Sequence, residues 1–286
     1  LATSLDYLVG KMKKKHGHRM DILGALSAKA AYARQHGLSY YTWLGVIPTY
    51  APEEDCRDPT HSTGHVYKAL AMLALLEYKE IDWVVFIDMD TLPSIKSIAP
   101  HDYIRLSDSA NIIGGSNPSL PILLNSGLLF IRNTHWSRSF LKRWWALRCG
   151  FKDQLSLWKA LFEAWGKETS FTYPDHALTS YAAARHYALP LVINQLSSLL
   201  EPGTRWDLST ERDALINTGC LLEPLRLRHL LLLPVVPFED KEFGKVPPSI
   251  SRDGAGPWND EYWICHAACV FDTPKKPKKI SEDQCR

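Results

Sequence analysis

Two aspartates separated by one residue, Asp88 and Asp90, directly follow an apolar run at residues 83–87. A continuous apolar run of this length is typical of a strand buried on both faces of a parallel sheet. Alternate side chains beyond such a strand can turn toward one crevice and offer the carboxylate oxygens that Mg²⁺ and Mn²⁺ prefer. A bound ion would act as a Lewis acid on a diphosphate leaving group. Because D-x-D also occurs by chance as two solvated loop carboxylates, the position after the strand is what favours a metal site.

Two further features could belong to the same site. Asn125-Ser126-Gly127 interrupts an apolar run at residues 123–130. Polar residues and a glycine inside a buried strand indicate either close approach of a ligand or a bulge whose amides are satisfied locally. His266 directly follows an aromatic strand signal at residues 262–265, and its imidazole could complete the metal's ligand set, although a lone histidine is more often structural.

The composition describes a folded domain without a strong field. The 286 residues are 45% hydrophobic and 22% charged, enough to bury a large core in one α/β domain or two closely fused halves. Because 33 basic residues nearly balance 31 acidic ones, the formal net charge is +2 and nucleic acid is not an expected partner. Lysine runs at residues 13–15 and 275–279 are read as solvated side chains, with a phosphate or membrane patch as the alternative.

Cysteines and hydropathy bear on the compartment. Six cysteines are too few to form the framework of a chain this long, but they allow a few disulfides in an oxidising lumen. Cys265 and Cys269 lack a second cysteine pair at zinc-ligand spacing. No apolar run of about twenty residues occurs, so the chain as given is expected to be soluble. Because it begins at Leu1, we expect an upstream segment that would hold any membrane anchor.

The elements that must position these side chains alternate along the chain. We expect helices at residues 26–36, 66–76, 134–148, 153–165 and 174–186, and strands at 39–44, 83–87, 111–114, 123–131, 189–194 and 262–265. Gly37 would end the first helix, and Ser62 or Thr63 would cap the second. This alternation implies right-handed βαβ units in a mostly parallel sheet, where ligands bind at the carboxyl ends of the strands.

The order and content of these motifs resemble glycosyltransferase family 34, a group of α-xylosyl-, α-galactosyl- and α-mannosyltransferases. Residues 28–37 look like the family's NK-x-x-Y-x-x-x-HG helix, Tyr67-Lys68 like its W-x-K, and residues 83–90 like its tryptophan-containing strand and D-x-D. Residues 125–136 match its N-[ST]-G-x-F-x-I-R-N-x-x-W run. Residues 265–269 look like its H-x-x-G-C, with alanine in place of the glycine. The resemblance covers roughly residues 20–270.

The resemblance implies the GT-A fold, a mostly parallel, Rossmann-like nucleotide-diphospho-sugar transferase fold, as one catalytic domain over residues 1–286. Residues 1–110 would form the nucleotide-sugar-binding half, which ends in the D-x-D, and residues 111–286 the acceptor-binding half, with acceptor loops at 196–260. The implied reaction is retaining transfer of a hexosyl or pentosyl unit from a UDP-sugar or GDP-mannose to an oligosaccharide, polysaccharide or glycoprotein glycan. Family members are usually type II membrane proteins of the Golgi lumen, which would place the anchor outside this chain.

Residue by residue, the resemblance implies Mn²⁺, or Mg²⁺, bound by Asp88, Asp90 and His266. The family also has an acidic residue followed by glutamine at the start of a later helix, near the reacting sugar carbon. We read this site as Asp175-His176, where Asp175 would stabilise positive charge on the sugar ring. His176 departs from the family's glutamine, and Asp175 could instead be an ordinary carboxylate at a helix N-terminus.

Seven further residues are expected to bind the donor: Thr3, Ser4, Asp6, Lys68, Asn125, Ser126 and Gly127. The first three lie at the end of an expected first strand, where such folds contact the base and ribose. Lys68 would meet the diphosphate, with an exposed helical lysine as the alternative.

Two other functions remain open. Residues 84–91 also resemble the nucleophile motif of haloacid-dehalogenase-type phosphatases, in which Asp88 would form a covalent phosphoaspartate. Leu92 stands where that family has threonine or valine, and its later paired acids and lysine have no convincing match. The other alternative is a catalytically inactive sugar-nucleotide-binding module that keeps the GT-A frame.

Overall fold

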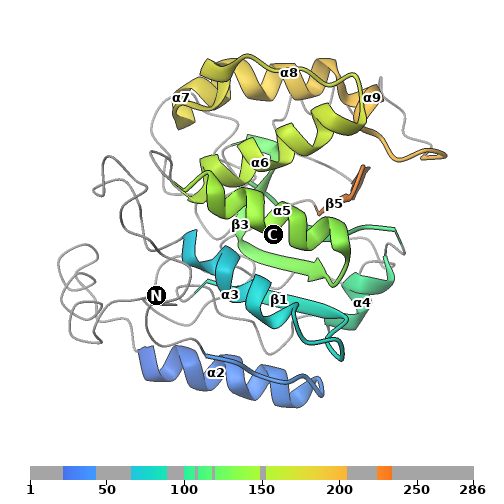
Figure 1. Ribbon diagram of the computed structural model, residues 1–286. Coiled ribbons are helices and arrows are strands. Elements are labelled where there is room, and N and C mark those ends of the chain that lie inside the picture. The colour runs from blue at the N-terminus through green and yellow to red at the C-terminus, as the bar shows by residue number, and fades with distance from the viewer. Residues whose placement is uncertain are drawn as a thin grey trace, which may run out of the picture.

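The computed structural model describes residues 22–42, 66–88, 100–106, 109–117, 120–148, 153–204 and 224–233. In this part of the chain, helices pack around a central sheet, so the protein is α/β as predicted (Figure 1). None of the described helices is long and apolar enough to cross a membrane.

The sheet is mixed, and its described strands run in the order β1-β3-β2-β5-β4. Their bounds are β1 Trp83–Ile87, β2 Ile112–Asn117, β3 Leu120–Arg132, β4 Leu225–Leu227 and β5 Leu230–Leu233. β3 is antiparallel to both β1 and β2, and β4 is antiparallel to β5. Only β2 and β5 are parallel neighbours among these strands. The strands predicted at 83–87, 111–114 and 123–131 are confirmed, but the prediction of a mostly parallel sheet is wrong for the described pairs.

Short connections explain two of the three antiparallel pairs. Residues 118 and 119 alone join β2 to β3, and Arg228 and His229 alone join β4 to β5. A connection of two residues returns the chain beside the strand it left, in the opposite direction, whereas parallel neighbours need a crossover of about a dozen residues or more. Because β3 is antiparallel to both β1 and β2, these two strands run in the same direction as each other.

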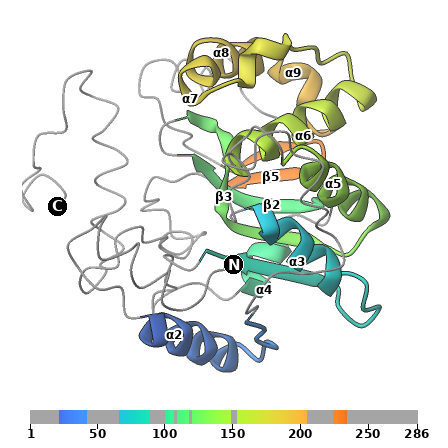
Figure 2. The ribbon, with the colours of Figure 1, turned by 60° about the vertical axis from the view of Figure 1, so that its left-hand side comes forward.

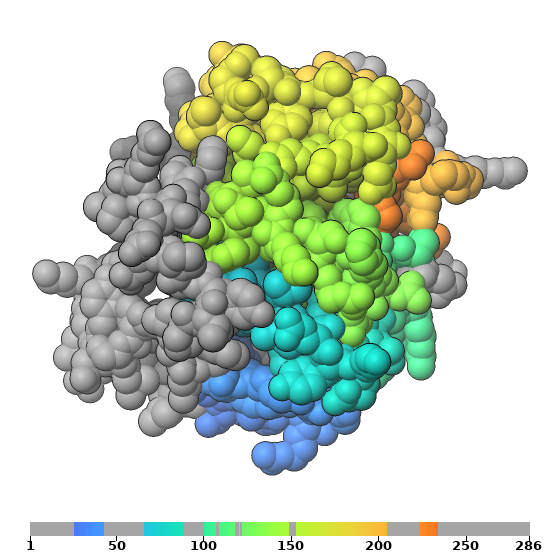
Figure 3. Space-filling view, viewed as in Figure 1, coloured from blue at the N-terminus to red at the C-terminus, as the bar shows by residue number. Residues whose placement is uncertain are grey.

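Helices α3, α5 and α6 pack on one face of the sheet (Figures 1 and 2), and their side chains adjoin on the surface in Figure 3. Leu129 and Ile131 of β3 belong to the core beneath them, whereas Leu128 and Phe130 belong to a smaller core with Tyr103 of α4. This alternation is the two-residue period of a strand. The helix bounds are α2 Ile22–Gln35, α3 Tyr67–Leu75, α4 Pro100–Arg105, α5 His135–Ala146, α6 Asp153–Glu168, α7 Tyr181–Ala183, α8 Leu189–Asn194 and α9 Leu196–Leu199, with a 3-10 helix η5 Asp175–Leu178 and a π-helix η6 Ala184–Ala188.

The ends of the predicted helices follow local chemistry. Gly37, at φ +65°, takes the left-handed conformation just after α2, as predicted. Thr134 caps α5, because its side chain accepts a hydrogen bond from the amide of Ser137. Ser62 and Thr63, the expected caps of α3, lie outside the described residues.

The segment after α6 differs from the sequence prediction. The helix predicted over 174–186 is divided, since η5 precedes α7 and Ser180 caps α7 through the amide of Ala183. The strand predicted at 189–194 is wrong, because this segment is helix α8. Pro190 suits the first turn of a helix, where its missing N–H has no intrahelical partner. Residues 39–42, part of another predicted strand, have no regular secondary structure.

Candidate functional site

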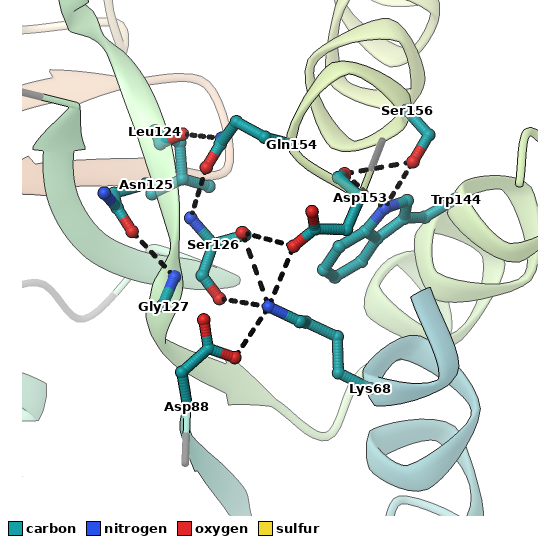
Figure 4. A network of polar contacts seen from close by, with 10 residues as sticks. All are labelled: Lys68, Asp88, Leu124, Asn125, Ser126, Gly127, Trp144, Asp153, Gln154 and Ser156. Carbon is teal, nitrogen blue, oxygen red and sulfur yellow. Dashed lines mark hydrogen bonds and ion pairs between the residues drawn. The ribbon is translucent and has the colours of Figure 1, made fainter. Parts of the chain in front are cut away.

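A buried lysine lies at the centre of a polar network at the carboxyl end of β1 (Figure 4). Lys68, the second residue of α3, has only 3% of its side chain exposed. Its Nζ lies 2.8 Å from Oδ1 of Asp88 and 2.9 Å from Oδ2 of Asp153. It also donates to the backbone oxygen of Ser126 at 3.2 Å. The alternative of an exposed helical lysine is therefore wrong, and one ammonium joins α3, β1, β3 and α6.

The charge of Lys68 is maintained by its two carboxylate partners. Burial alone would lower the pKa of this ammonium, but the negative charges of Asp88 and Asp153, and their hydrogen bonds, more than offset the burial and raise the pKa above its ordinary value. Lys68 is thus a positively charged group throughout the physiological pH range.

The polar interruption in β3 is a bulge. Gly114 of β2 faces Leu129, and two residues later Ser116 faces Leu124, so residues 125–128 lie outside the ladder to β2. Asn125 Oδ1 accepts a hydrogen bond from the amide of Gly127 at 2.7 Å. The bulge alternative predicted that amides in this segment find partners locally, and the amide of Gly127 does so. In the bulge, the Ser126 backbone oxygen accepts a hydrogen bond from Lys68, and Ser126 has no partner residue in β2.

The first turn of α6 holds this bulge in place. Ser126 Oγ donates to Asp153 Oδ2 at 2.8 Å, and the Ser126 amide donates to Gln154 Oε1 at 2.9 Å. Gln154 Nε2 in turn donates to the Leu124 carbonyl, which also accepts from Trp158 Nε1 at 2.7 Å. Asp153 and Gln154 are therefore part of the site, and the sequence reading did not include them.

A signal for these two residues exists in the sequence. The expected family feature is an acidic residue followed by glutamine at the start of a later helix, and Asp153-Gln154 opens α6 in this way. Asp175 and His176, to which we assigned the feature, lie in η5 and are exposed. The described contacts of His176 include the ring of Tyr187, 4.8 Å away between centroids, and no described contact joins either residue to the Lys68 network.

A second buried lysine reaches the same strand end. Lys29 of α2 is 6% exposed, and its Nζ donates to the backbone oxygen of Asp88 at 2.5 Å. Asp88 is thus contacted by one lysine at its carboxylate and by another at its carbonyl. Lys29 belongs to the helix whose motif resembled the family pattern, which is the sequence signal that marks it.

The remaining predicted site residues, Thr3, Ser4, Asp6, Asp90 and His266, lie outside the described residues. Within the described ranges, no group of three or more histidine, cysteine, aspartate or glutamate side chains could hold a metal ion. Of the predicted positions that are described, Lys68, Asp88 and Ser126 come together directly, and Asn125 and Gly127 shape the bulge beside them.

Fold and site together define an α/β protein with a mixed sheet and a buried lysine held between two carboxylates. No protein-family profile matches the chain, and no curated protein matches it. A solved structure that resembles it is described as "crystal structure of a glycosyltransferase involved in the glycosylation of the major capsid of PBCV-1". The likeness has a TM-score of 0.39 and 17% identity, and covers 51% of this chain and 73% of that one. That neighbour is a glycosyltransferase, but a likeness this weak establishes neither a shared fold nor a shared function.

Proposed function

We propose that this protein is a metal-dependent glycosyltransferase that takes its sugar from a nucleotide-sugar donor at the Lys68 network. The observation that supports this most is the buried Lys68 ammonium between Asp88 and Asp153, residues 65 positions apart in the sequence (153 − 88). A positive charge suits a diphosphate, and a carboxylate at a strand end suits a divalent ion. The motif resemblance to family 34 extends the proposal to retaining transfer and to a Golgi location.

The described part of the site fits a divalent metal ion in its donor chemistry. Asp88 follows β1 directly, its carboxylate is 27% exposed, and a carboxylate oxygen is a hard ligand of the kind that Mn²⁺ and Mg²⁺ prefer. A cation, the Lys68 ammonium, already lies against this carboxylate. Asp90 and His266 are proposed to complete the ligand set. The bound ion would supply Lewis-acid stabilisation of the leaving diphosphate.

The chain's own residues would then act as follows. Lys68 would place its charge beside the donor's phosphates or the sugar hydroxyls nearest to them. Asp153, 16% exposed and fixed by Ser126 and Lys68, replaces Asp175 as our candidate for the acid that stabilises positive charge on the sugar ring. The Asn125 to Gly127 bulge would line the donor site with a backbone that Gln154 keeps in place.

The test is nucleotide release from UDP-xylose, UDP-galactose, UDP-glucose and GDP-mannose, with and without Mn²⁺. We expect metal-dependent release from one donor, abolished by Asp90→Ala. Asp153→Asn should lower the rate by about a hundredfold or more, the usual effect of losing a group that stabilises transition-state charge. Asp175→Asn, the same change at the other candidate acid, separates the two assignments, since only the true acid shows the large loss.

Three results would overturn the proposal. Absence of both release and binding for every donor, with the variants correctly folded, would remove the transferase. A phosphoaspartate at Asp88 after incubation with a phosphate ester would instead establish the phosphatase alternative. Donor binding without turnover would identify the inactive binding module.

A further inference from the structure

Lys68 lies on the carboxylate that the metal ion would use. Its Nζ is 2.8 Å from Asp88 Oδ1, and 3% exposure of the side chain means that little water screens the contact. A divalent ion bound to Asp88 would therefore meet a positive charge already in place. Two cations held by the same carboxylate repel each other strongly where little water screens them. The ammonium and the metal ion therefore compete for Asp88.

Asp153 offers the ammonium a second position. Its Oδ2 is 2.9 Å from Lys68 Nζ, and the Ser126 backbone oxygen lies 3.2 Å from the same nitrogen. Asp153 belongs to α6 and lies on the opposite side of the ammonium from Asp88, and Ser126 belongs to the β3 bulge (Figure 4). The lysine side chain has a flexible stem of four carbons, so a small movement would release Asp88 while these two contacts remain.

We propose that Lys68 is the internal cation that the metal ion displaces from Asp88, and that Asp153 is the positioning residue that retains the displaced ammonium. This inference rests on the proposed metal-dependent transferase. It adds that Lys68 opposes metal binding in the free protein, whereas Asp153 promotes it indirectly, through Lys68.

The experiment measures Mn²⁺ affinity of the full chain without donor, by calorimetry and by the paramagnetic resonance signal of free Mn²⁺. Lys68→Met should bind Mn²⁺ more tightly than the native protein, by about fivefold or more, the lower end of typical coupling between two ligands. Lys142→Met is the matched control, because Lys142 is an exposed lysine of α5 and its loss changes the net charge equally. This control should leave the affinity unchanged.

Asp153→Asn gives the opposite expectation. With its second partner weakened, Lys68 is held by Asp88 alone, and Mn²⁺ should bind about fivefold more weakly. In the double variant Lys68→Met with Asp153→Asn, the effect of Asp153 should disappear, because no ammonium remains to be retained. If the negative charge of Asp153 instead attracted Mn²⁺ directly, Asp153→Asn would weaken Mn²⁺ binding equally with and without Lys68. That result would overturn the role given to Asp153.

The outcomes separate this inference from the proposed function. If the native protein binds Mn²⁺ and Lys68→Met binds it equally or more weakly, the displacement is wrong while the metal site stands. If neither protein binds Mn²⁺, the metal site fails and the inference fails with it. Thermal unfolding followed by circular dichroism checks that each variant is folded. Should Lys68→Met not fold, Asp153→Asn decides alone, and an unchanged Mn²⁺ affinity overturns the inference.

Discussion

Gln154 bonds two backbone groups at the β3 bulge. Its side-chain oxygen accepts from the Ser126 amide, and its side-chain nitrogen donates to the Leu124 carbonyl. The side chain is buried, with 3% of the residue exposed, so water cannot easily replace these bonds. The geometry of Ser126, and with it one contact of Lys68, therefore depends on a residue that touches neither carboxylate.

Gln154→Leu should lower the free energy of unfolding by about 1–3 kcal/mol, since it leaves the buried Ser126 amide without its partner, while the Leu124 carbonyl keeps its bond from Trp158. Gln195→Leu is a matched control, because Gln195 makes the same two kinds of bond to Thr172, at 3.0 and 2.8 Å, in an exposed place. There water can take over, and the loss should stay below about 1 kcal/mol. Urea unfolding curves measure both values, and equal losses would contradict the role assigned to Gln154.

Part of this site could be predicted from local sequence and part could not. Asp88, Lys68 and residues 125–127 carry local signals, namely a strand end, a helical lysine and a polar interruption of an apolar run. Asp153 carried the signal of an acid followed by glutamine at a helix start, but local sequence does not show that this helix start reaches the bulge. Its role depends on how far residues 125–128 leave the ladder, a register feature that arises from three packed elements. The acid and glutamine motif was therefore assigned to Asp175 and His176, where the local pattern was similar but the packing is different.

At the level of elements, β2 shows why the bulge needs a glycine beside it. A Cβ added to Gly114 would lie 2.5 Å from Leu124 Cδ1 and 3.1 Å from the Leu128 carbonyl oxygen. Leu124 precedes the bulge and Leu128 is its last residue, so the absent side chain is what allows β3 to approach β2 there. At Gly115, an added Cβ would meet nothing within 4 Å.

These neighbouring glycines give a paired prediction. Gly114→Ala should destabilise the protein by about 1–3 kcal/mol, because the extra methyl group overpacks a buried contact. Gly115→Ala should change stability by no more than about 0.5 kcal/mol. Thermal unfolding of both variants tests this, and a larger loss at Gly115 would mean that the close approach of β3 lies elsewhere. If Gly114→Ala also weakens binding of a nucleotide sugar, the bulge and the proposed donor site are coupled.

Elements with a clear hydrophobic period were predicted correctly, whereas a short apolar run without a period was not. The helices at 134–148 and 153–165 have clear helical spacing, and α5 and α6 agree with them. Residues 189–194 are a short apolar run without period, and such a run does not distinguish a buried strand from a buried helix. The antiparallel direction of β2 with β3 and of β4 with β5 was missed because it depends on connections of two residues, which the alternation of helix and strand signals does not show.

Over the whole molecule, α6 links the site to the opposite end of the sheet. Its 16 residues span roughly 24 Å. Asp153 opens it at the Lys68 network, and Glu168 closes it. Glu168 accepts a hydrogen bond from Trp136 Nε1 at 2.9 Å and pairs with His229 Nε2 at 2.6 Å. The ring of His229 stacks on Trp136, with 4.2 Å between centroids. The position of Asp153 thus depends on a helix fixed at both ends.

Three groups make the stability of the whole molecule sensitive to alkali. Burial, reinforced by the charge of Asp102, raises the pKa of Tyr32 to about 12 from 10.0. Burial, with the charges of Glu163 and Asp175, raises the pKa of Tyr173 to about 12 against a smaller opposing effect of Arg143. The raised pKa of Lys68 acts in the same direction. For each group the folded state holds its proton more tightly, so its stabilising effect is complete below the unfolded pKa and is lost as pH rises through the folded pKa.

The free energy of unfolding should therefore fall between pH 10 and pH 12, and Tyr32→Phe should reduce that fall. Allowing for partial solvent screening, we expect the tyrosine to account for about 1 kcal/mol of the fall. Urea unfolding at intervals from pH 8 to pH 12 measures the slope, and ultraviolet absorbance follows tyrosinate formation. Tyr78→Phe is the control, because Tyr78 is 57% exposed. Loss of a hydroxyl contact would shift the plot of unfolding free energy against pH equally at every pH, whereas loss of a raised pKa changes only its slope above pH 10. A parallel shift alone would show that Tyr32 titrates alike in the folded and unfolded chains.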